Sequence, residues 1–147
     1  MKALIQRVSS ARVEIDGRPV SEIENGLLVF LCAVKGDTDR DLEYIVKKVS
    51  KLRIFEDEHG KMNLSIIDIK GEVLVVSQFT LAASTRKGNR PSFDTAEAPE
   101  QAKVIYDTFV MKLREAGHSV QTGVFANSMA VSLTNDGPVT ILIDSRE

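Results

Sequence analysis

The apolar run from Leu27 to Val34 constrains the fold more than any other feature of the sequence. The run is continuous and has no polar face, so it predicts a strand that is buried on both sides. The β-branched residues between Glu72 and Phe79 predict a second central strand. These two runs indicate that the core of the protein is built around a β-sheet.

Weaker patterns predict the remaining elements. Further strands are expected at residues 2–8, 11–15, 53–55, 119–125, 128–133 and 139–143. Asp16-Gly17 predicts a hairpin turn after residue 15, because this pair tolerates positive φ angles. Apolar residues at helical spacing predict a helix over residues 39–52, preceded by a capping box of Thr38 and Asp41, and a second helix that starts near Pro99 and stops at Gly117.

The order of these elements predicts an α+β fold, in which two helices cover a largely antiparallel, barrel-like sheet. Residues 1–147 are expected to form one domain, because single domains usually have about 100–200 residues and no repeat or linker interrupts the chain. A doubly wound parallel fold is not expected, since strands and helices do not alternate regularly and there is no glycine-rich phosphate loop.

Charge and rare residues limit the classes of function. The formal net charge of −2 argues against a protein that coats nucleic acid through a broad basic face. Cys32 is the only cysteine, so an internal disulfide or a cysteine-based zinc site is excluded and a reducing compartment is favoured. No apolar run is long enough for a membrane span, and the residues after Met1 do not resemble a secretion signal. We therefore predict a cytoplasmic protein that does not act at a membrane.

The two histidines, His59 and His118, lie at predicted turns or element ends. We expect both to be solvated polar residues and not catalytic bases. Cys32 lies inside the apolar run, where a thiol usually behaves as a small core residue. An enzyme built on this sequence is therefore expected to work without histidine, cysteine, a metal or a cofactor.

The segment from Ser77 to Leu81 places hydroxyl and amide groups at the end of a predicted buried strand. Backbone N–H groups that leave the ladder at such a point can face a developing oxyanion. Alternatively, the side chains only satisfy local backbone groups, as serine and threonine often do where a strand ends. No adjacent histidine, lysine or aspartate is available to activate a hydroxyl.

Two other segments carry weaker signals. Gly137-Pro138 separates two predicted strands and indicates a turn, for which a trans peptide bond is the ordinary case. Arg86, Lys87 and Arg90 concentrate positive charge in a predicted surface loop at residues 83–93. Such a group is usually a solvated surface, and otherwise a site that contacts phosphate.

Taken together, these segments resemble the D-aminoacyl-tRNA deacylase family, formerly called D-tyrosyl-tRNA deacylase. The resemblance covers essentially all 147 residues and is strongest in three stretches, Ser77-Gln78-Phe79-Thr80, Arg90-Pro91-Ser92-Phe93 and Asn135-Asp136-Gly137-Pro138-Val139-Thr140. It implies hydrolysis of the ester that joins a D-amino acid, or glycine, to the 3′-terminal adenosine of tRNA. It also implies a homodimer with two sites at the subunit interface.

The resemblance assigns residues to this site. The catalytic pocket of one subunit is expected to contain Ser77, Gln78, Phe79 and Thr80. Gly137 and Pro138 of the partner subunit are expected to enter that pocket, joined by a cis bond, and to occupy the volume that an L side chain would need.

Two further sets of residues are implied to contact the substrate. Phe125 and Met129 are expected near the terminal nucleotide or in the pocket wall, although apolar residues near strands are more often core. Arg86, Lys87 and Arg90 are expected to contact phosphates of the acceptor end of tRNA.

The expected mechanism uses backbone donors near Phe79 and Thr80 to receive the carbonyl oxygen of the ester. The Thr80 hydroxyl is a candidate nucleophile or water-orienting group, unless the ribose 2′-hydroxyl of the substrate fulfils that role. Two other functions stay open at this point. One is a non-catalytic dimer that binds RNA ends, and the other is an ester hydrolase for a small metabolite.

Overall fold

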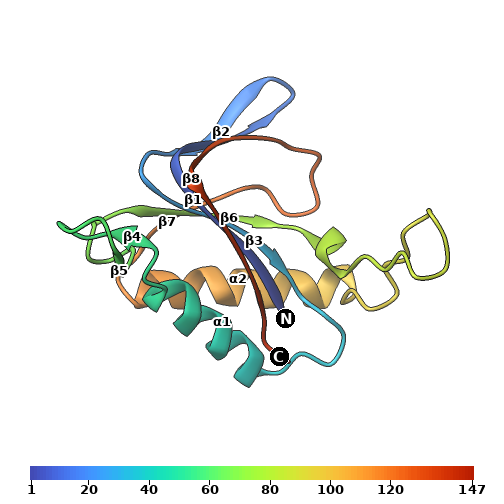
Figure 1. Ribbon diagram of the computed structural model, residues 1–147. Coiled ribbons are helices and arrows are strands. Elements are labelled where there is room, and N and C mark those ends of the chain that lie inside the picture. Colours follow the sequence, from blue (N-terminus) through green and yellow to red (C-terminus); the bar gives the residue numbers. More distant parts are fainter.

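The computed structural model describes residues 1–147. Its elements are β1 (Lys2–Ile15), β2 (Arg18–Ile23), β3 (Gly26–Cys32), α1 (Asp39–Lys51), β4 (Phe55–Glu56), β5 (Met62–Leu64), β6 (Glu72–Ser77), the 3-10 turn η1 (Phe79–Ala82), α2 (Pro99–Glu115), β7 (Ser119–Thr122) and β8 (Ala130–Asp144). Figure 1 shows both helices on one face of the main sheet. None of the helices is both long enough and apolar enough to cross a membrane.

The long strand β1 organises the main sheet. One of its edges pairs first with β3 and then with β2, and its other edge pairs with β8, all in antiparallel orientation. On the far side of β3 the order continues through β6 to β7, and these two pairings are parallel. Because β2 also contacts β6 and β7, the sheet curls toward a barrel. The prediction of an α+β, barrel-like fold with two covering helices is confirmed, with parallel pairing around β6 as the exception to the antiparallel pattern.

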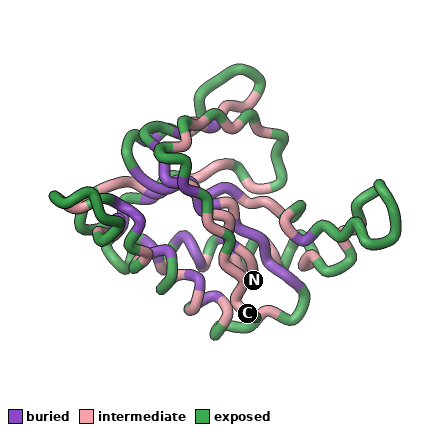
Figure 2. The backbone as a smooth tube through the Cα atoms, viewed as in Figure 1, coloured by how far each residue is buried: buried purple, intermediate pink, exposed green.

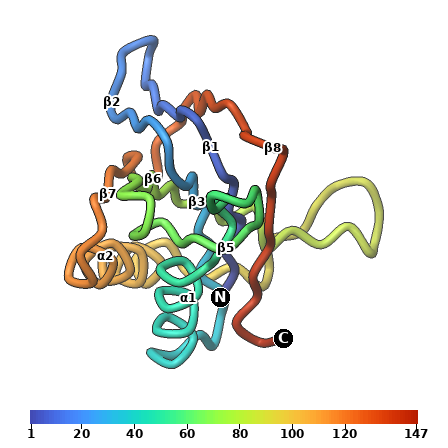
Figure 3. The backbone as a smooth tube through the Cα atoms, turned by 60° about the vertical axis from the view of Figure 1, so that its left-hand side comes forward, coloured from blue at the N-terminus to red at the C-terminus, as the bar shows by residue number.

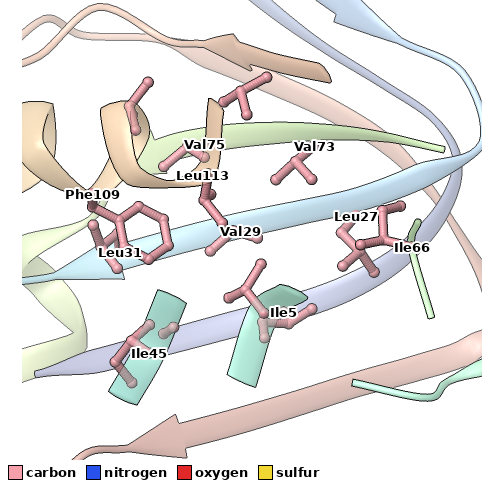
Figure 4. Packing of buried hydrophobic residues seen from close by; sticks show 14 of the residues in the cluster. Ile5, Leu27, Val29, Leu31, Ile45, Ile66, Val73, Val75, Phe109 and Leu113 are labelled. Carbon is pink, nitrogen blue, oxygen red and sulfur yellow. The ribbon is translucent and has the colours of Figure 1, made fainter. Parts of the chain in front are cut away.

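The side chains of β3 point alternately into two apolar clusters. Leu27, Val29 and Leu31 face the helices, where Ile45 of α1 packs in the same cluster (Figure 4). Leu28 points the other way, into a smaller cluster formed with residues of β1, β2 and β6. The apolar run therefore forms a strand that is buried on both faces, as its composition predicts.

The helix boundaries follow the predicted signals. The carboxylate of Asp41 accepts hydrogen bonds from both the backbone N–H and the hydroxyl of Thr38, each at 2.8 Å. This contact closes the start of α1, as the capping-box pattern predicts. The helix α2 has Pro99 in its first turn and ends just before Gly117, where the φ angle of +92° suits glycine.

The structure corrects several predicted strands. The strand predicted at 53–55 is β4 at Phe55–Glu56, and the one predicted at 119–125 ends at Thr122 as β7. Residues 2–8 and 11–15 form one continuous strand, and so do the predicted strands at 128–133 and 139–143, which merge into β8. The predicted turn at Gly137-Pro138 is therefore a distortion inside a strand. Local sequence indicates a turn there, but β1 runs past the whole segment and pairs with β8 on both sides of it.

The distortion in β8 is a bulge opposite a single residue of β1. Val8 pairs with Asn135 and Gln6 pairs with Thr140, so Arg7 alone faces the residues between them. The extra residues leave the ladder and project from the sheet. This bulge contains Gly137-Pro138, whose peptide bond is cis.

The expectation that both histidines are solvated is wrong for His118. Its ring is buried, and Nε2 lies 2.8 Å from Oγ of Ser50 at the end of α1. Burial lowers the pKa of His118, which favours the neutral ring. The reason is tertiary, because the turn after α2 brings His118 against α1. His59 is exposed, as expected.

Candidate active site

The candidate site begins where the central strand β6 ends. Gln78 continues the β6 ladder for one more bond, in which its N–H donates to the carbonyl of Leu31 at 2.8 Å. The chain then turns into η1, which starts at Phe79. The pairing of β6 with β7 ends at Val75, whereas β3 pairs with β6 as far as Ser77, so β3 alone holds this strand end in the sheet.

A cavity of about 490 Å³ opens beside this strand end. One wall is the end of β6 and the start of η1, and the opposite wall is the loop that leads into β8. The lining residues are Val76, Ser77, Gln78, Phe79, Pro99, Phe125, Ala126, Asn127, Ser128, Met129 and Val131. None of these side chains is ionisable, so the cavity provides hydrogen-bonding and apolar groups but no charged acid or base.

The structure brings five of the predicted residues together at this cavity, namely Ser77, Gln78, Phe79, Phe125 and Met129. Phe125 and Met129 also pack against the two core clusters, and the ring of Phe125 lies 5.7 Å from that of Tyr106. The sequence left open whether these two residues belong to the core or to the pocket. Phe125 and Met129 belong to both regions, since one side of each packs against the core while the other lines the cavity.

Thr80 lies at the rim and is exposed. Its Oγ1 accepts a hydrogen bond of 2.5 Å from Nε2 of Gln78. This bond fixes the hydroxyl oxygen and leaves its proton free to donate. No basic side chain is hydrogen-bonded to the hydroxyl, so nothing in the structure activates Thr80 as a nucleophile.

The first turn of η1 offers two backbone donors. Within the turn, Leu81 N–H donates to the carbonyl of Gln78 and Ala83 N–H donates to that of Thr80. The N–H groups of Phe79 and Thr80 come first, where no carbonyl of the turn can reach them. Two adjacent N–H groups of this kind are the usual components of an oxyanion hole.

Cys32 packs behind η1. Its sulfur lies 3.6 Å from the carbonyl oxygen of Phe79. Burial raises the pKa of the thiol, so Cys32 is neutral and acts as a small core residue, as predicted.

The surface loop at residues 83–93, called here the basic loop, lies next to the cavity, but none of its residues lines it. It begins after η1 and is closed by two backbone bonds between Ser84 and Ser92, of 2.8 and 2.9 Å. Arg86, Lys87 and Arg90 are exposed on it, and no carboxylate lies within 4.0 Å of any of them. Figures 1 and 3 show this loop projecting away from the body of the molecule, and Figure 2 shows that its projecting part, residues 83–91, is exposed.

At the base of this loop, Phe93 meets the ring of Phe79 edge to face, with 5.1 Å between the ring centres. Phe79 is still 56% exposed and also lines the cavity. The pair therefore connects the basic loop to the rim of the cavity.

Gly137 and Pro138 lie elsewhere in the chain. Their distance from Ser77 can be followed along β1. Ser77 pairs with Leu31 of β3, and Leu31 pairs with Ala3 of β1. The β8 bulge lies opposite Arg7, four residues further along β1. Both bulge residues are exposed and neither lines the cavity. Within one chain, the structure does not bring residues 77–80 and residues 135–140 together.

Arg7 is a buried residue beside the β8 bulge that sequence reasoning missed. Its side chain is buried, yet it carries a charge. Nη1 donates to the carbonyl of Ile54 at 2.6 Å, and Nε donates to the carbonyl of Asp136 at 3.0 Å. Ala3, Ile5 and Arg7 occupy alternate, buried positions of β1. A charged residue at a position where the alternation predicts an apolar one was the signal in the sequence that could have identified Arg7.

The bulge is also held from its own strand. The side-chain oxygen of Asn135 accepts the N–H of Val139 at 3.1 Å, and its amide nitrogen donates to Oγ1 of Thr140 at 2.9 Å. Together with Arg7, these bonds fix the backbone on both sides of Gly137-Pro138.

Comparisons with known proteins give a consistent result. Residues 4–144 match the sequence model of a family described as D-Tyr-tRNA(Tyr) deacylase. The D-aminoacyl-tRNA deacylase of Persephonella marina is 60% identical over 146 residues, which is 99% of each chain. That of Aquifex aeolicus is 56% identical over 100% of this chain and 99% of its own.

Two solved structures share the fold. One, titled c-Myc DNA Unwinding Element Binding Protein, superimposes with a TM-score of 0.93 at 42% identity and covers 98% of both chains. The other, titled as a probable eukaryotic D-amino acid tRNA deacylase, has a TM-score of 0.82 at 18% identity over 97% of this chain and 98% of its own. At that identity the second likeness supports the fold alone.

Proposed function

The chain belongs to the D-aminoacyl-tRNA deacylase family, and we propose that it hydrolyses the ester between a D-amino acid and the 3′-terminal adenosine of tRNA. The observation that carries this function is the full-length match to the family and to curated deacylases at up to 60% identity. The protein is thus a carboxylic ester hydrolase, and its products are the free amino acid and tRNA. Family membership confirms the resemblance carried by residues 77–80 and 135–140.

The cavity at the end of β6 has the chemistry that this reaction needs. An ester is an activated acyl compound, so positioned donors and a positioned water supply much of the rate without a strong side-chain base. The N–H groups of Phe79 and Thr80 are the donors for the carbonyl oxygen. Water adds to the carbonyl carbon, the bond to the ribose 3′-oxygen breaks, and a proton from the water ends on that oxygen.

Thr80 acts as an orienting group in this proposal. Its oxygen is held by Gln78 and its proton is free, so it can donate to water or to the ribose. The proton relay falls to the ribose 2′-hydroxyl, because no ionisable side chain lines the cavity. The 2′-hydroxyl is next to the leaving 3′-oxygen in the substrate itself, which makes it the nearest group that can pass on a proton.

The active form is a homodimer in this proposal, and the β8 strand supports that state. One edge of β8 pairs with β1 and the other pairs with nothing, although the strand has 15 residues. A long unpaired edge is a template for pairing with another chain. Leu142 of the same strand is 59% exposed.

The dimer explains how one site can use residues 77–80 of one subunit and residues 135–140 of the other. Gly137 and Pro138 of the partner subunit would enter the cavity beside Ser77 and Phe79. A rigid backbone at this position occupies the volume of an L side chain, while a D side chain points outward. Glycine has no side chain to exclude, so glycyl-tRNA is a substrate as well.

The tRNA contacts and the compartment complete the proposal. Arg86, Lys87 and Arg90 are exposed cations without carboxylate partners, and the pair Phe79–Phe93 connects their loop to the cavity rim. We assign them to phosphates of the acceptor end. A tRNA substrate and a lone reduced cysteine, Cys32, fit the cytoplasm.

A solved relative is titled as a DNA-binding protein, but duplex binding is not proposed for this chain. A protein that binds a duplex tightly neutralises many phosphates with lysine and arginine. The formal net charge of this chain is −2. The charge fits contact with one end of an RNA better than a broad contact with a duplex.

One comparison of substrates tests the function against its alternatives. The purified protein is incubated with D-aminoacyl-tRNA and with a simple ester of the same D-amino acid, and release of the free amino acid is followed. We expect rapid release from the tRNA and little from the simple ester. Tight tRNA binding without release would indicate a non-catalytic RNA-end-binding protein. Equal cleavage of both would indicate a hydrolase for small esters.

A further inference from the structure

A second basic surface lies on α1, away from the cavity. It is a concave surface with a volume of about 360 Å³, called here the α1 groove, and it is lined by Tyr44, Lys47, Lys48, Lys51, Leu52 and Arg53. Four of these side chains are cationic and none is acidic. This density of positive charge is notable in a chain whose net charge is −2.

The cations of the α1 groove have no carboxylate partners. Lys47, Lys48 and Lys51 are exposed, and no ion pair within 4.0 Å involves them or Arg53. Arg53 donates to an amide oxygen, that of Asn63, at 3.2 Å. The ammonium group of Lys48 lies 5.2 Å from the centre of the Tyr44 ring, a cation–π contact that leaves its charge available.

Fold stability does not account for this cluster. Lys47 and Lys51 are four residues apart on the helix, a spacing at which like charges destabilise by about 0.2–0.5 kcal/mol. The helix dipole favours cations in the last turn, which explains Lys48 and Lys51. It does not explain Arg53, which lies beyond the helix. Lys47 immediately precedes the last turn, and Glu43, four residues before it, pairs with Lys112 instead. A ligand with several negative charges does explain all four.

We propose that the α1 groove binds backbone phosphates of tRNA at a part of the molecule remote from the aminoacylated end. The inference rests on the proposed function, which makes tRNA the substrate. Lysine and arginine around an aromatic ring are the usual composition of an RNA-binding surface. In Figure 1 the end of α1 lies across the molecule from η1 and the basic loop, so the two basic surfaces reach different parts of one extended RNA.

The test compares two variants of equal charge. In the first, Lys47→Gln and Lys51→Gln are combined. In the control, Arg18→Gln and Arg40→Gln are combined, because these residues are also exposed, also lack ion pairs, and lie outside the α1 groove. Each variant is assayed on full-length D-aminoacyl-tRNA and on a short D-aminoacylated oligonucleotide that carries only the 3′-terminal nucleotides.

The Lys47/Lys51 variant is expected to raise KM for full-length tRNA roughly tenfold at about 0.1 M salt and to reduce the salt dependence of KM, since each lost phosphate contact removes about 0.7–0.9 from the slope. Its kcat, and its KM for the short substrate, are expected to match those of the unmodified protein. The control is expected to leave all of these values unchanged. Substitution of Arg86 and Arg90 by glutamine is expected to raise KM for both substrates.

Three results would overturn the inference: an unchanged KM for full-length tRNA, an equal rise in the control, or an equal rise on the short substrate. Binding of uncharged tRNA is measured in parallel and is independent of catalysis. If the unmodified protein cleaves neither substrate, the proposed function fails. Whether the α1 groove binds tRNA is then still tested by the affinity for uncharged tRNA, which should be lower for the Lys47/Lys51 variant than for the control.

Discussion

Replacement of Gly137 by alanine is expected to reduce the single-turnover rate of D-aminoacyl-tRNA cleavage by about 100-fold or more. A Cβ atom at this position would lie 2.8 Å from Nη2 of Arg7 and 2.9 Å from Cγ2 of Val139, and the φ angle of +129° is one that L side chains rarely adopt. The bulge therefore has to move, and displacement of a positioning group by about 1 Å can cost about 100-fold in rate.

The matched control for this prediction is Gly17→Ala in the first hairpin. Gly17 also has a positive φ, of +74°, but no atom lies within 4 Å of the added Cβ. The control is expected to lower stability by about 1–2 kcal/mol, the cost of a left-handed conformation for an L residue, and to leave the rate unchanged. Thermal unfolding of both variants separates loss of fold from loss of function. A folded Gly137→Ala protein with a rate within about threefold of the unmodified one would show that the bulge takes no part in the reaction.

Removal of the substrate 2′-hydroxyl is expected to have the second large effect. A D-aminoacyl-tRNA that ends in 2′-deoxyadenosine should be cleaved about 100-fold to 10,000-fold more slowly, which is the usual contribution of a proton-transfer group. Thr80→Ala should lower the rate only about tenfold, because in the proposed mechanism Thr80 orients a neighbour and does not exchange a proton with a base. The lining of the cavity, which contains no ionisable side chain, is the basis for this expectation.

Single-turnover kinetics with enzyme in excess checks both changes, and Thr80→Ser is the control because it keeps the hydroxyl. We expect the Thr80→Ser protein to cleave D-aminoacyl-tRNA at a rate near that of the unmodified protein. If Thr80→Ala abolished cleavage while the 2′-deoxy substrate reacted normally, the assignment would be reversed. Thr80 would then be the nucleophile, and the ribose would have no role in the chemistry.

The elements with strong local signals were predictable from the sequence. The apolar run from Leu27 to Val34 can be identified as a buried strand without knowledge of its partner strands. Thr38 and Asp41 define the start of a helix within four residues. Both signals are set by neighbours along the chain. For the same reason the polar end of β6, at Ser77 and Gln78, could be located without knowledge of the tertiary structure.

Features that depend on distant pairing were not predictable. Gly137-Pro138 has the composition of a turn, and only the long partner strand β1 makes it a bulge inside β8. The role of Arg7 depends on the carbonyls of Ile54 and Asp136, which are far from it in sequence. His118 is buried for a similar reason, since α1 packs over it.

In the proposed mechanism, the cavity rejects L-aminoacyl-tRNA by excluding the L side chain. Single-turnover rates decide this with three substrates, in which the same tRNA carries the D enantiomer of one amino acid, its L enantiomer, or glycine. Exclusion of a side chain predicts that the D and glycyl esters are cleaved at similar rates and that the L ester is hydrolysed no faster than without protein. Cleavage of the L ester at a rate near that of the D ester, or resistance of the glycyl ester, would contradict it.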